Sequence, residues 1–181
     1  LNIPLSYINQ TSFEHCFIDT DVKILPALKC LITGKSYNVK RFISDNFSSF
    51  LKDILKKNKY DVIQLETIYV APYLELIRNT SPESVVVLRA HNVEHLIWER
   101  NAKYETNILK KFYIKHLAKT LKKYETNIFN KFDGIACISD VDNVIIKKYA
   151  EKTNVKTIPF NISDSFINKE VKDFAKRHIS L

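Results

Sequence analysis

Short apolar runs alternate with longer amphipathic stretches along most of the chain. Runs of strand length occur at 15–19, 60–66, 84–90, 134–139 and 155–160. Three of them are almost continuously hydrophobic, as expected of parallel strands that are buried on both faces of a sheet. The stretches between them place apolar residues at helical spacing. This alternation predicts an α/β fold with a Rossmann-like open parallel sheet and helices on both faces.

Two long segments are predicted to be helical. The first covers residues 38–58, and the second covers 93–131 with a break near Thr106–Asn107. The second segment carries lysines that lie largely off its apolar stripe: Lys111, Lys115, Lys119, Lys122 and Lys123. A solvated helix face and a strip that contacts an anionic membrane surface both fit this pattern, and both interpretations stay open.

The size and composition indicate a globular domain. A chain of 181 residues is long enough for one domain with a core. No apolar run approaches the roughly 18 residues that a membrane span requires, and the first residues do not resemble a signal peptide. We therefore expect a cytoplasmic protein, with peripheral contact at the inner face of the membrane as the open alternative. Cys16, Cys30 and Cys137 share no metal-ligand spacing and are predicted to be buried free thiols.

The positive charge does not indicate a nucleic-acid partner. The formal net charge is +8, but most of the 28 basic residues are Lys rather than Arg. Bidentate recognition of phosphates and guanines favours Arg. We therefore expect no nucleic acid among the partners.

One segment offers a candidate metal motif. His91, Glu94 and His95 have the H-x-x-E-H spacing of an inverted zinc-protease motif. Both histidines would bind one metal ion if they lay one turn apart on a single helix. They follow the predicted strand 84–90 instead, which places His91 in a turn and makes Asn92 the expected N-cap of the next helix. We favour a strand end without a metal and keep a metalloprotease as the weaker alternative.

A second segment resembles the end of a phosphate-binding loop. Residues 34–36 read Gly-Lys-Ser, but Lys29 stands where the first glycine of a Walker A motif belongs. No predicted strand leads into the segment. We therefore do not predict a phosphate-binding loop at these residues.

Polar residues follow several predicted strands at the points where the strands end. In open α/β sheets, ligands bind outside the carboxyl ends of the strands. Ser139 also begins S-D-V-D, a capping box that starts the next helix. The strand-end residues predicted to line one cleft are Glu66, Thr67, Arg89, His91, Asn92, Ser139, Asp140 and Asn161.

The order of these motifs resembles a known enzyme family. From about residue 37 onward the chain carries RAHNVEHLIWER, the long basic helix, ACISDVD and IPFNIS, in that order. This series resembles the N-terminal domain of bacterial glycosyltransferase family 4, the retaining enzymes of GT-B fold. The early residues Leu1 to Asn38 lack the Gly-rich loop with which that domain usually begins.

The resemblance implies a function and a set of roles. It implies that residues 1–181 form a partial, acceptor-side N-terminal domain, inactive alone, whose donor-binding partner domain is not in this chain. The reaction would use a nucleotide-sugar as substrate and no metal or cofactor, with a saccharide or lipid-linked acceptor. His91 would be catalytic, and Glu66, Arg89, Asn92 and Ser139 would line the acceptor cleft. The alternative is a non-catalytic binding or membrane-docking domain that uses the helix Lys111–Lys123.

Overall fold

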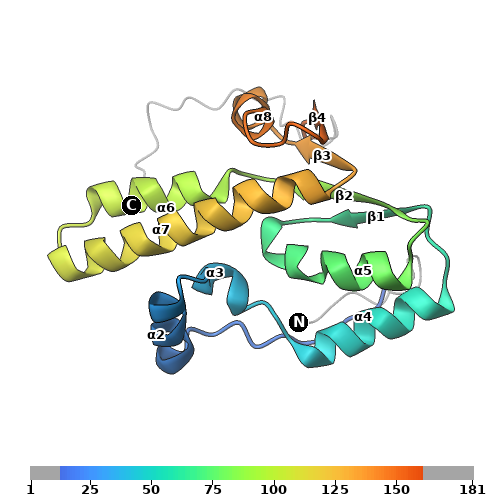
Figure 1. The fold of residues 1–181 in the computed structure, drawn as a ribbon, viewed down its shortest axis with the longest axis horizontal. Coiled ribbons are helices and arrows are strands. Elements are labelled where there is room, and N and C mark those ends of the chain that lie inside the picture. Colours follow the sequence, from blue (N-terminus) through green and yellow to red (C-terminus); the bar gives the residue numbers. More distant parts are fainter. Residues whose placement is uncertain (1–12, 161–181) are drawn as a thin grey trace, which may run out of the picture.

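The protein folds around a parallel sheet (Figure 1), and the computed structural model describes residues 13–160. All neighbouring strands pair in parallel, and their order in the sheet follows their order in the sequence. The strands are β1 (Val62–Leu65), β2 (Val85–Ala90), β3 (Gly134–Cys137) and β4 (Asn154–Thr157). They coincide with the predicted runs from residue 60 onward. The predicted α/β fold with a Rossmann-like open parallel sheet is therefore confirmed.

The strand predicted at 15–19 is wrong. Residues 13–23 form neither a helix nor a strand. The side chain of Phe17 is 84% exposed, so this apolar run does not enter the core. A short apolar run becomes a strand when it finds a partner strand and a surface to cover, and this one has neither within residues 13–160.

Within residues 13–160, three helices precede the sheet: α2 (Ile24–Thr33), α3 (Tyr37–Lys40) and α4 (Asp45–Lys57). The single helix predicted over 38–58 is thus divided. The hydroxyl of Tyr73 donates to the Phe42 carbonyl at 2.7 Å and accepts from the Ser44 amide at 2.8 Å. The Ser44 hydroxyl then accepts from the Phe47 amide at 3.3 Å and caps α4.

Helical segments connect each strand to the next. The connections are η1 (Ile68–Tyr73) with α5 (Leu74–Thr80), α6 (Glu94–Tyr104) with α7 (Ile108–Ile128) and η2 (Phe129–Lys131), and α8 (Asp140–Lys147). Figure 1 shows α6 and α7 as a long hairpin that projects from the sheet. Asn107 caps α7 by accepting from the Lys110 amide at 3.0 Å. The predicted break near Thr106–Asn107 is therefore confirmed.

The two faces of the sheet differ in burial. Val86, Leu88 and Ile135 are 0%, 0% and 2% exposed and belong to the main hydrophobic core. Alternate residues of a strand point to opposite faces, so their neighbours point the other way. On that side Val62 is 58% exposed and Val85 is 46% exposed. The described helices therefore bury one face more completely than the other.

A smaller cluster holds α2 and α3 against the helical hairpin. Its buried members are Ala27, Cys30, Tyr37 and Leu117. Cys16, Cys30 and Cys137 are free thiols, and the predicted burial is confirmed for Cys30 and Cys137 but is wrong for Cys16, which is only partly buried. Within residues 13–160 no helix is both long enough and apolar enough to cross a bilayer.

Candidate functional site at the carboxyl ends of the strands

The ends of β1 and β2 bring Glu66 and His91 together. Glu66 follows β1 directly and His91 follows β2 directly, and the strand register pairs Leu65 with Leu88. The Nε2 atom of His91 lies 3.0 Å from Oε2 of Glu66. Both side chains remain accessible, with 39% of the His91 side chain and 59% of the Glu66 side chain exposed. Two predicted cleft residues thus form a hydrogen-bonded pair at the solvent-facing edge.

The surroundings of Glu66 determine which ring nitrogen of His91 carries a proton. The Gln64 side-chain amide donates to Glu66 and, with His91, holds the pKa of this carboxyl below its usual value. An ionised carboxylate only accepts hydrogen bonds, so Nε2 of His91 carries a proton and donates. The second ring nitrogen, Nδ1, is then an acceptor in the neutral imidazole.

Arg89 and Phe160 complete this edge. Arg89 is 9% exposed, and its guanidinium lies 5.1 Å from the ring centroid of Phe160. The same Phe160 ring approaches the His91 ring edge-on, with 5.8 Å between centroids. Phe160 was not predicted as a site residue, although it lies in the IPFNIS segment. Asn161, which was predicted, lies outside the described residues.

Ser139 lies at the end of β3 and caps the next helix. Its hydroxyl accepts from the Asp142 amide at 3.1 Å and donates to the Asp142 carboxylate at 2.6 Å. The predicted capping role of Ser139 is therefore confirmed, although the Asp142 carboxylate accepts from the hydroxyl of Ser139 and not from its backbone amide, as a capping box would have it. The hydroxyl therefore caps α8, and Ser139 also lies at the same edge of the sheet as His91.

The predicted N-cap role of Asn92 is wrong. Helix α6 begins at Glu94 with Val93 in the N-cap position, and the N-cap side chain makes no capping hydrogen bond. Glu125 of α7 supplies the cap from a distance. Its Oε1 accepts from the Glu94 amide at 3.0 Å and its Oε2 accepts from the His95 amide at 2.8 Å. A tertiary contact thus replaces the local one.

His95 lies in surroundings quite unlike those of His91. Its Nδ1 is 2.6 Å from Oε2 of Glu125, and both side chains are 1% exposed. The two histidines of H-x-x-E-H therefore belong to separate hydrogen-bonded pairs, one buried and one at the edge. In the described part of the chain, no group of three or more His, Cys, Asp or Glu side chains is arranged to hold a metal ion.

Tyr69 and Glu94 form a further polar contact next to the buried His95–Glu125 pair. The Tyr69 hydroxyl donates to Oε2 of Glu94 at 2.9 Å. Burial raises the pKa of Glu94, and the nearby Glu125 carboxylate raises it further. Burial and the same carboxylates raise the pKa of Tyr69, so its phenol stays protonated and remains a donor.

Asn92 faces a separate hollow. It lines a cavity of about 380 Å³ between α6 and α8, together with Asp142, Arg100 and Lys103. The structure therefore places Arg89 and His91 against Phe160 and pairs His91 with Glu66, whereas Asn92 lines the adjoining cavity between α6 and α8.

Glu125 and Gln64 were missed by sequence reasoning, although each left a signal. Glu125 falls on the apolar stripe of α7, four residues after Leu121, and an acidic residue at a core position needs a buried partner. Gln64 lies two residues before Glu66, and residues at that spacing in an extended chain share a face.

No family model, curated protein or solved structure shows a significant match to the chain. The fold itself therefore assigns the class. This is an α/β protein with an open parallel sheet and a His–Glu–Arg cluster at the carboxyl edge of its strands.

Proposed function

We propose that the chain is the acceptor-side domain of a glycosyltransferase that moves a sugar from a nucleotide-sugar to a saccharide or a related cell-surface acceptor. The observation that supports this most is the His91–Glu66 pair beside the Arg89–Phe160 stack at the carboxyl edge of the sheet. The motif series RAHNVEHLIWER, ACISDVD and IPFNIS adds the resemblance to glycosyltransferase family 4.

The cluster has the chemistry that a sugar requires. Sugars present hydroxyl donors along their edges and C–H groups on their faces. Each oxygen of the Glu66 carboxylate accepts one hydrogen bond within the protein, which leaves lone pairs for ligand hydroxyls. The Phe160 ring is 63% exposed and offers a flat apolar surface to a sugar face.

His91 is the proposed catalytic residue. Glu66 holds the imidazole through Nε2, so Nδ1 is the ring nitrogen that stays available for a sugar hydroxyl or a developing positive charge. The adjacent Arg89 is a buried positive charge suited to an anionic substrate group. Glu66, Arg89, Asn92 and Ser139 would position the acceptor.

Two measurements test this proposal. The first assay uses the longest available protein that includes these 181 residues. Mass spectrometry measures sugar transfer from a panel of UDP- and GDP-sugars to saccharide acceptors. The 181-residue chain itself is titrated with saccharides while the histidine resonances are followed by NMR. We expect donor turnover that His91→Ala lowers by about a hundredfold or more, and a saccharide-dependent shift of the His91 ring signals.

The exposed His15 provides the matched control, and His15→Ala should leave turnover unchanged. The proposal would be wrong if no donor is transferred or hydrolysed and no saccharide shifts the ring signals of His91.

A second candidate function is docking to an anionic membrane, and one observation favours it. The tip of the α6–α7 hairpin, at the far end of the projection in Figure 1, exposes large apolar side chains. Tyr104, Ile108, Leu109 and Phe112 are 77%, 82%, 83% and 72% exposed. Apolar side chains rimmed by lysines are typical of helices that lie in a membrane interface.

The lysines of α7 divide between two sides of the helix. Lys111, Lys115, Lys119 and Lys122 line a groove between α6 and α7, whereas Lys123 lines a different cavity. Vesicle sedimentation tests the docking function with two variants, Leu109→Ser with Phe112→Ser and Lys115→Glu with Lys119→Glu. We expect binding to anionic vesicles that both variants weaken. Equal binding to neutral and anionic vesicles, or none to either, would overturn this candidate.

A further inference from the structure

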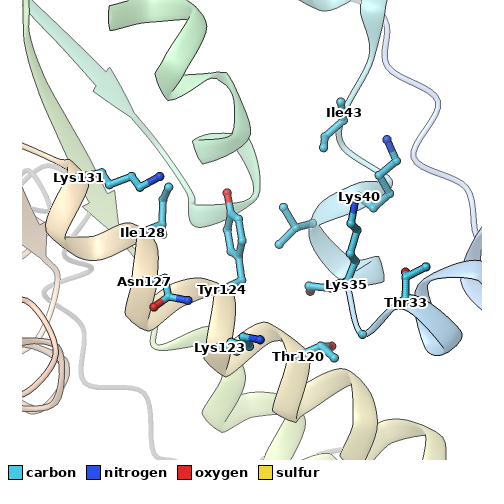
Figure 2. Close-up of a pocket in the computed structure, with 13 residues that line it drawn as sticks. Thr33, Lys35, Lys40, Ile43, Thr120, Lys123, Tyr124, Asn127, Ile128 and Lys131 are labelled. Carbon is cyan, nitrogen blue, oxygen red and sulfur yellow. The ribbon is translucent and has the colours of Figure 1, made fainter.

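A cavity that lies away from the strand ends is lined by an unusual combination of side chains. It has a volume of about 450 Å³ and lies between the 33–43 segment and the C-terminal half of α7 (Figure 2). Helix α7 leads through η2 into the first residue of β3, so this end of the helix adjoins the amino ends of the strands. Neither His91 nor Glu66 lines the cavity, so it is separate from the site at the carboxyl ends of the strands.

All charged side chains that line the cavity are positive. Its lining includes Lys35, Lys40, Lys123 and Lys131 and no Asp or Glu. None of these lysines forms an ion pair with a carboxylate in the described part of the chain. Four uncompensated ammonium groups around one hollow repel one another, and an anion inside it would relieve that repulsion.

Two buried hydroxyls in the same lining lack partners. The Oγ atom of Ser36 and the Oη atom of Tyr124 are both inaccessible to solvent and make no hydrogen bond within residues 13–160. Ser36 is 9% exposed as a whole. Buried hydroxyls in native proteins are almost always hydrogen-bonded. Two unsatisfied donors that line one cationic cavity indicate a ligand that accepts hydrogen bonds.

The protonation of Tyr124 agrees with a donor role. Burial raises the pKa of its phenol well above the ordinary value, so the hydroxyl keeps its proton at neutral pH. Figure 2 shows the Tyr124 side chain rising from α7 into the space between that helix and the Lys35–Lys40 segment. A protonated phenol can donate a hydrogen bond, and the ammonium groups beside it only donate, so the combination suits an anion and not a cation.

The remaining wall is apolar. Val39, Ile43 and Ile128 contribute hydrocarbon surface, and the stems of the lysines extend it. A bare inorganic anion would leave this surface in contact with water. We propose that the cavity binds a phosphate monoester, with its phosphate held by Lys35, Lys123, Ser36 and Tyr124 and its organic part against the apolar wall. The phosphate belongs either to a lipid headgroup or to a soluble ester.

The mode of binding differs from that of a phosphate-binding loop. Gly34 ends α2 in the left-handed region, with φ 65°, and turns the chain so that Lys35 and Ser36 enter the cavity wall. A helix precedes this glycine where a Walker A loop needs a strand. The Gly-Lys-Ser segment therefore contributes the residues Lys35 and Ser36 to the cavity wall.

Titration calorimetry on the 181-residue chain tests the proposal with three probes: inorganic phosphate, butyl phosphate, and vesicles that contain phosphatidic acid. Butyl phosphate should bind about tenfold more tightly than inorganic phosphate, because its chain covers the apolar wall. Tight binding of butyl phosphate without vesicle binding identifies a soluble ester. Vesicle binding that requires phosphatidic acid and the cavity lysines identifies a lipid headgroup.

Two double variants carry the test. Lys35→Gln with Lys123→Gln should weaken butyl phosphate binding at least about tenfold. The control is Lys52→Gln with Lys56→Gln, which removes the same charge from exposed positions of α4 outside the cavity and should leave the affinity within about twofold. Equal loss in both double variants would show nonspecific attraction to a basic protein and would overturn the proposal, as would the absence of binding to any probe.

The double variant Ser36→Ala with Tyr124→Phe distinguishes a role of these hydroxyls in ligand binding from a purely structural role. These hydroxyls have no partner in the free protein, so their removal should leave the thermal midpoint unchanged or raise it. The same change should weaken butyl phosphate binding by about tenfold, because both donors to the phosphate are lost. Unchanged affinity in this folded variant would contradict the assigned site.

Discussion

The Nδ1 atom of His95 lies 2.6 Å from Oε2 of Glu125, and this pair is sealed inside the protein with both side chains 1% exposed. The same carboxylate accepts the first two amides of α6. One side chain of α7 therefore satisfies the start of α6 and fixes the orientation of the segment that begins at His91. The buried His95–Glu125 pair thereby helps to position His91, because only residues 92–94 separate the two histidines.

Glu125→Ala should be among the most destabilising single changes in this protein. It removes the cap of α6 and leaves the His95 ring buried without its acceptor, which together should cost about 3 kcal/mol of unfolding free energy. Urea unfolding followed by circular dichroism measures the loss. Glu99→Ala is the matched control on α6, since its 3.6 Å contact with Lys122 is exposed, and it should change stability by less than about 0.5 kcal/mol. Similar values for the two variants would contradict a structural role for Glu125.

The parts of the fold that were predicted correctly are those that local patterns determine. Buried strands are continuous apolar runs, and β2 and β3 appear where such runs occur. The break before α7 follows from the Asn107 cap, and the start of α8 follows from Ser139. Each of these signals is contained within a few neighbouring residues, so it can be recognised without knowledge of the tertiary contacts.

The parts that were not predicted depend on contacts between distant segments. Asn92 has the residue type of an N-cap, but the Glu125 carboxylate reaches the same amides from another helix and replaces it. Phe160 reaches the site because β4 lies beside β3, which brings its end near Arg89 and His91. The location of Glu66 and His91 at one edge of the sheet followed from the rule for strand ends, whereas their hydrogen bond and its protonation required the structure.

The pKa of Glu66 provides a test of how the edge cluster is organised. The Gln64 amide is the largest cause of the lowered value, and His91 adds to it. Gln64→Leu should therefore raise the Glu66 pKa more than His91→Ala does. Carboxyl carbon NMR titration measures both, with Glu75→Gln on α5 as a control that should leave the Glu66 pKa unchanged. A larger effect of His91→Ala would mean that the imidazole, and not the amide, determines the charge of this carboxylate.

Glu94 should give a stability that depends on pH in a defined direction. Burial raises its pKa in the folded state above the ordinary value of a glutamate. A raised pKa contributes stability below the unfolded-state value, and this contribution is lost as the pH rises through the folded-state value. Glu94→Gln cannot ionise, so its stability relative to the native protein should increase between about pH 4 and about pH 7.

Urea unfolding at the two pH values checks this expectation for Glu94. Glu99→Gln, at an exposed position of the same helix, should show no such increase. A relative stability of Glu94→Gln that falls as the pH rises would show that the ionised carboxylate is favoured at the start of α6 despite its burial.

Ser139 allows the capping role to be separated from a role in ligand binding. Ser139→Ala removes the hydroxyl that accepts from the Asp142 amide and should cost about 1 kcal/mol of unfolding free energy. Ser139→Thr retains a capping hydroxyl and should recover most of that loss, while its added methyl group narrows the edge near His91. Ser49→Ala, at an exposed position inside α4, should be neutral or slightly stabilising because Ala favours helix. Thermal unfolding measures all three changes. If Ser139→Thr restores stability yet abolishes the saccharide-dependent shift of the His91 signals, Ser139 lines the acceptor cleft as well as capping α8; if both stability and the shift are retained, its role is confined to the cap.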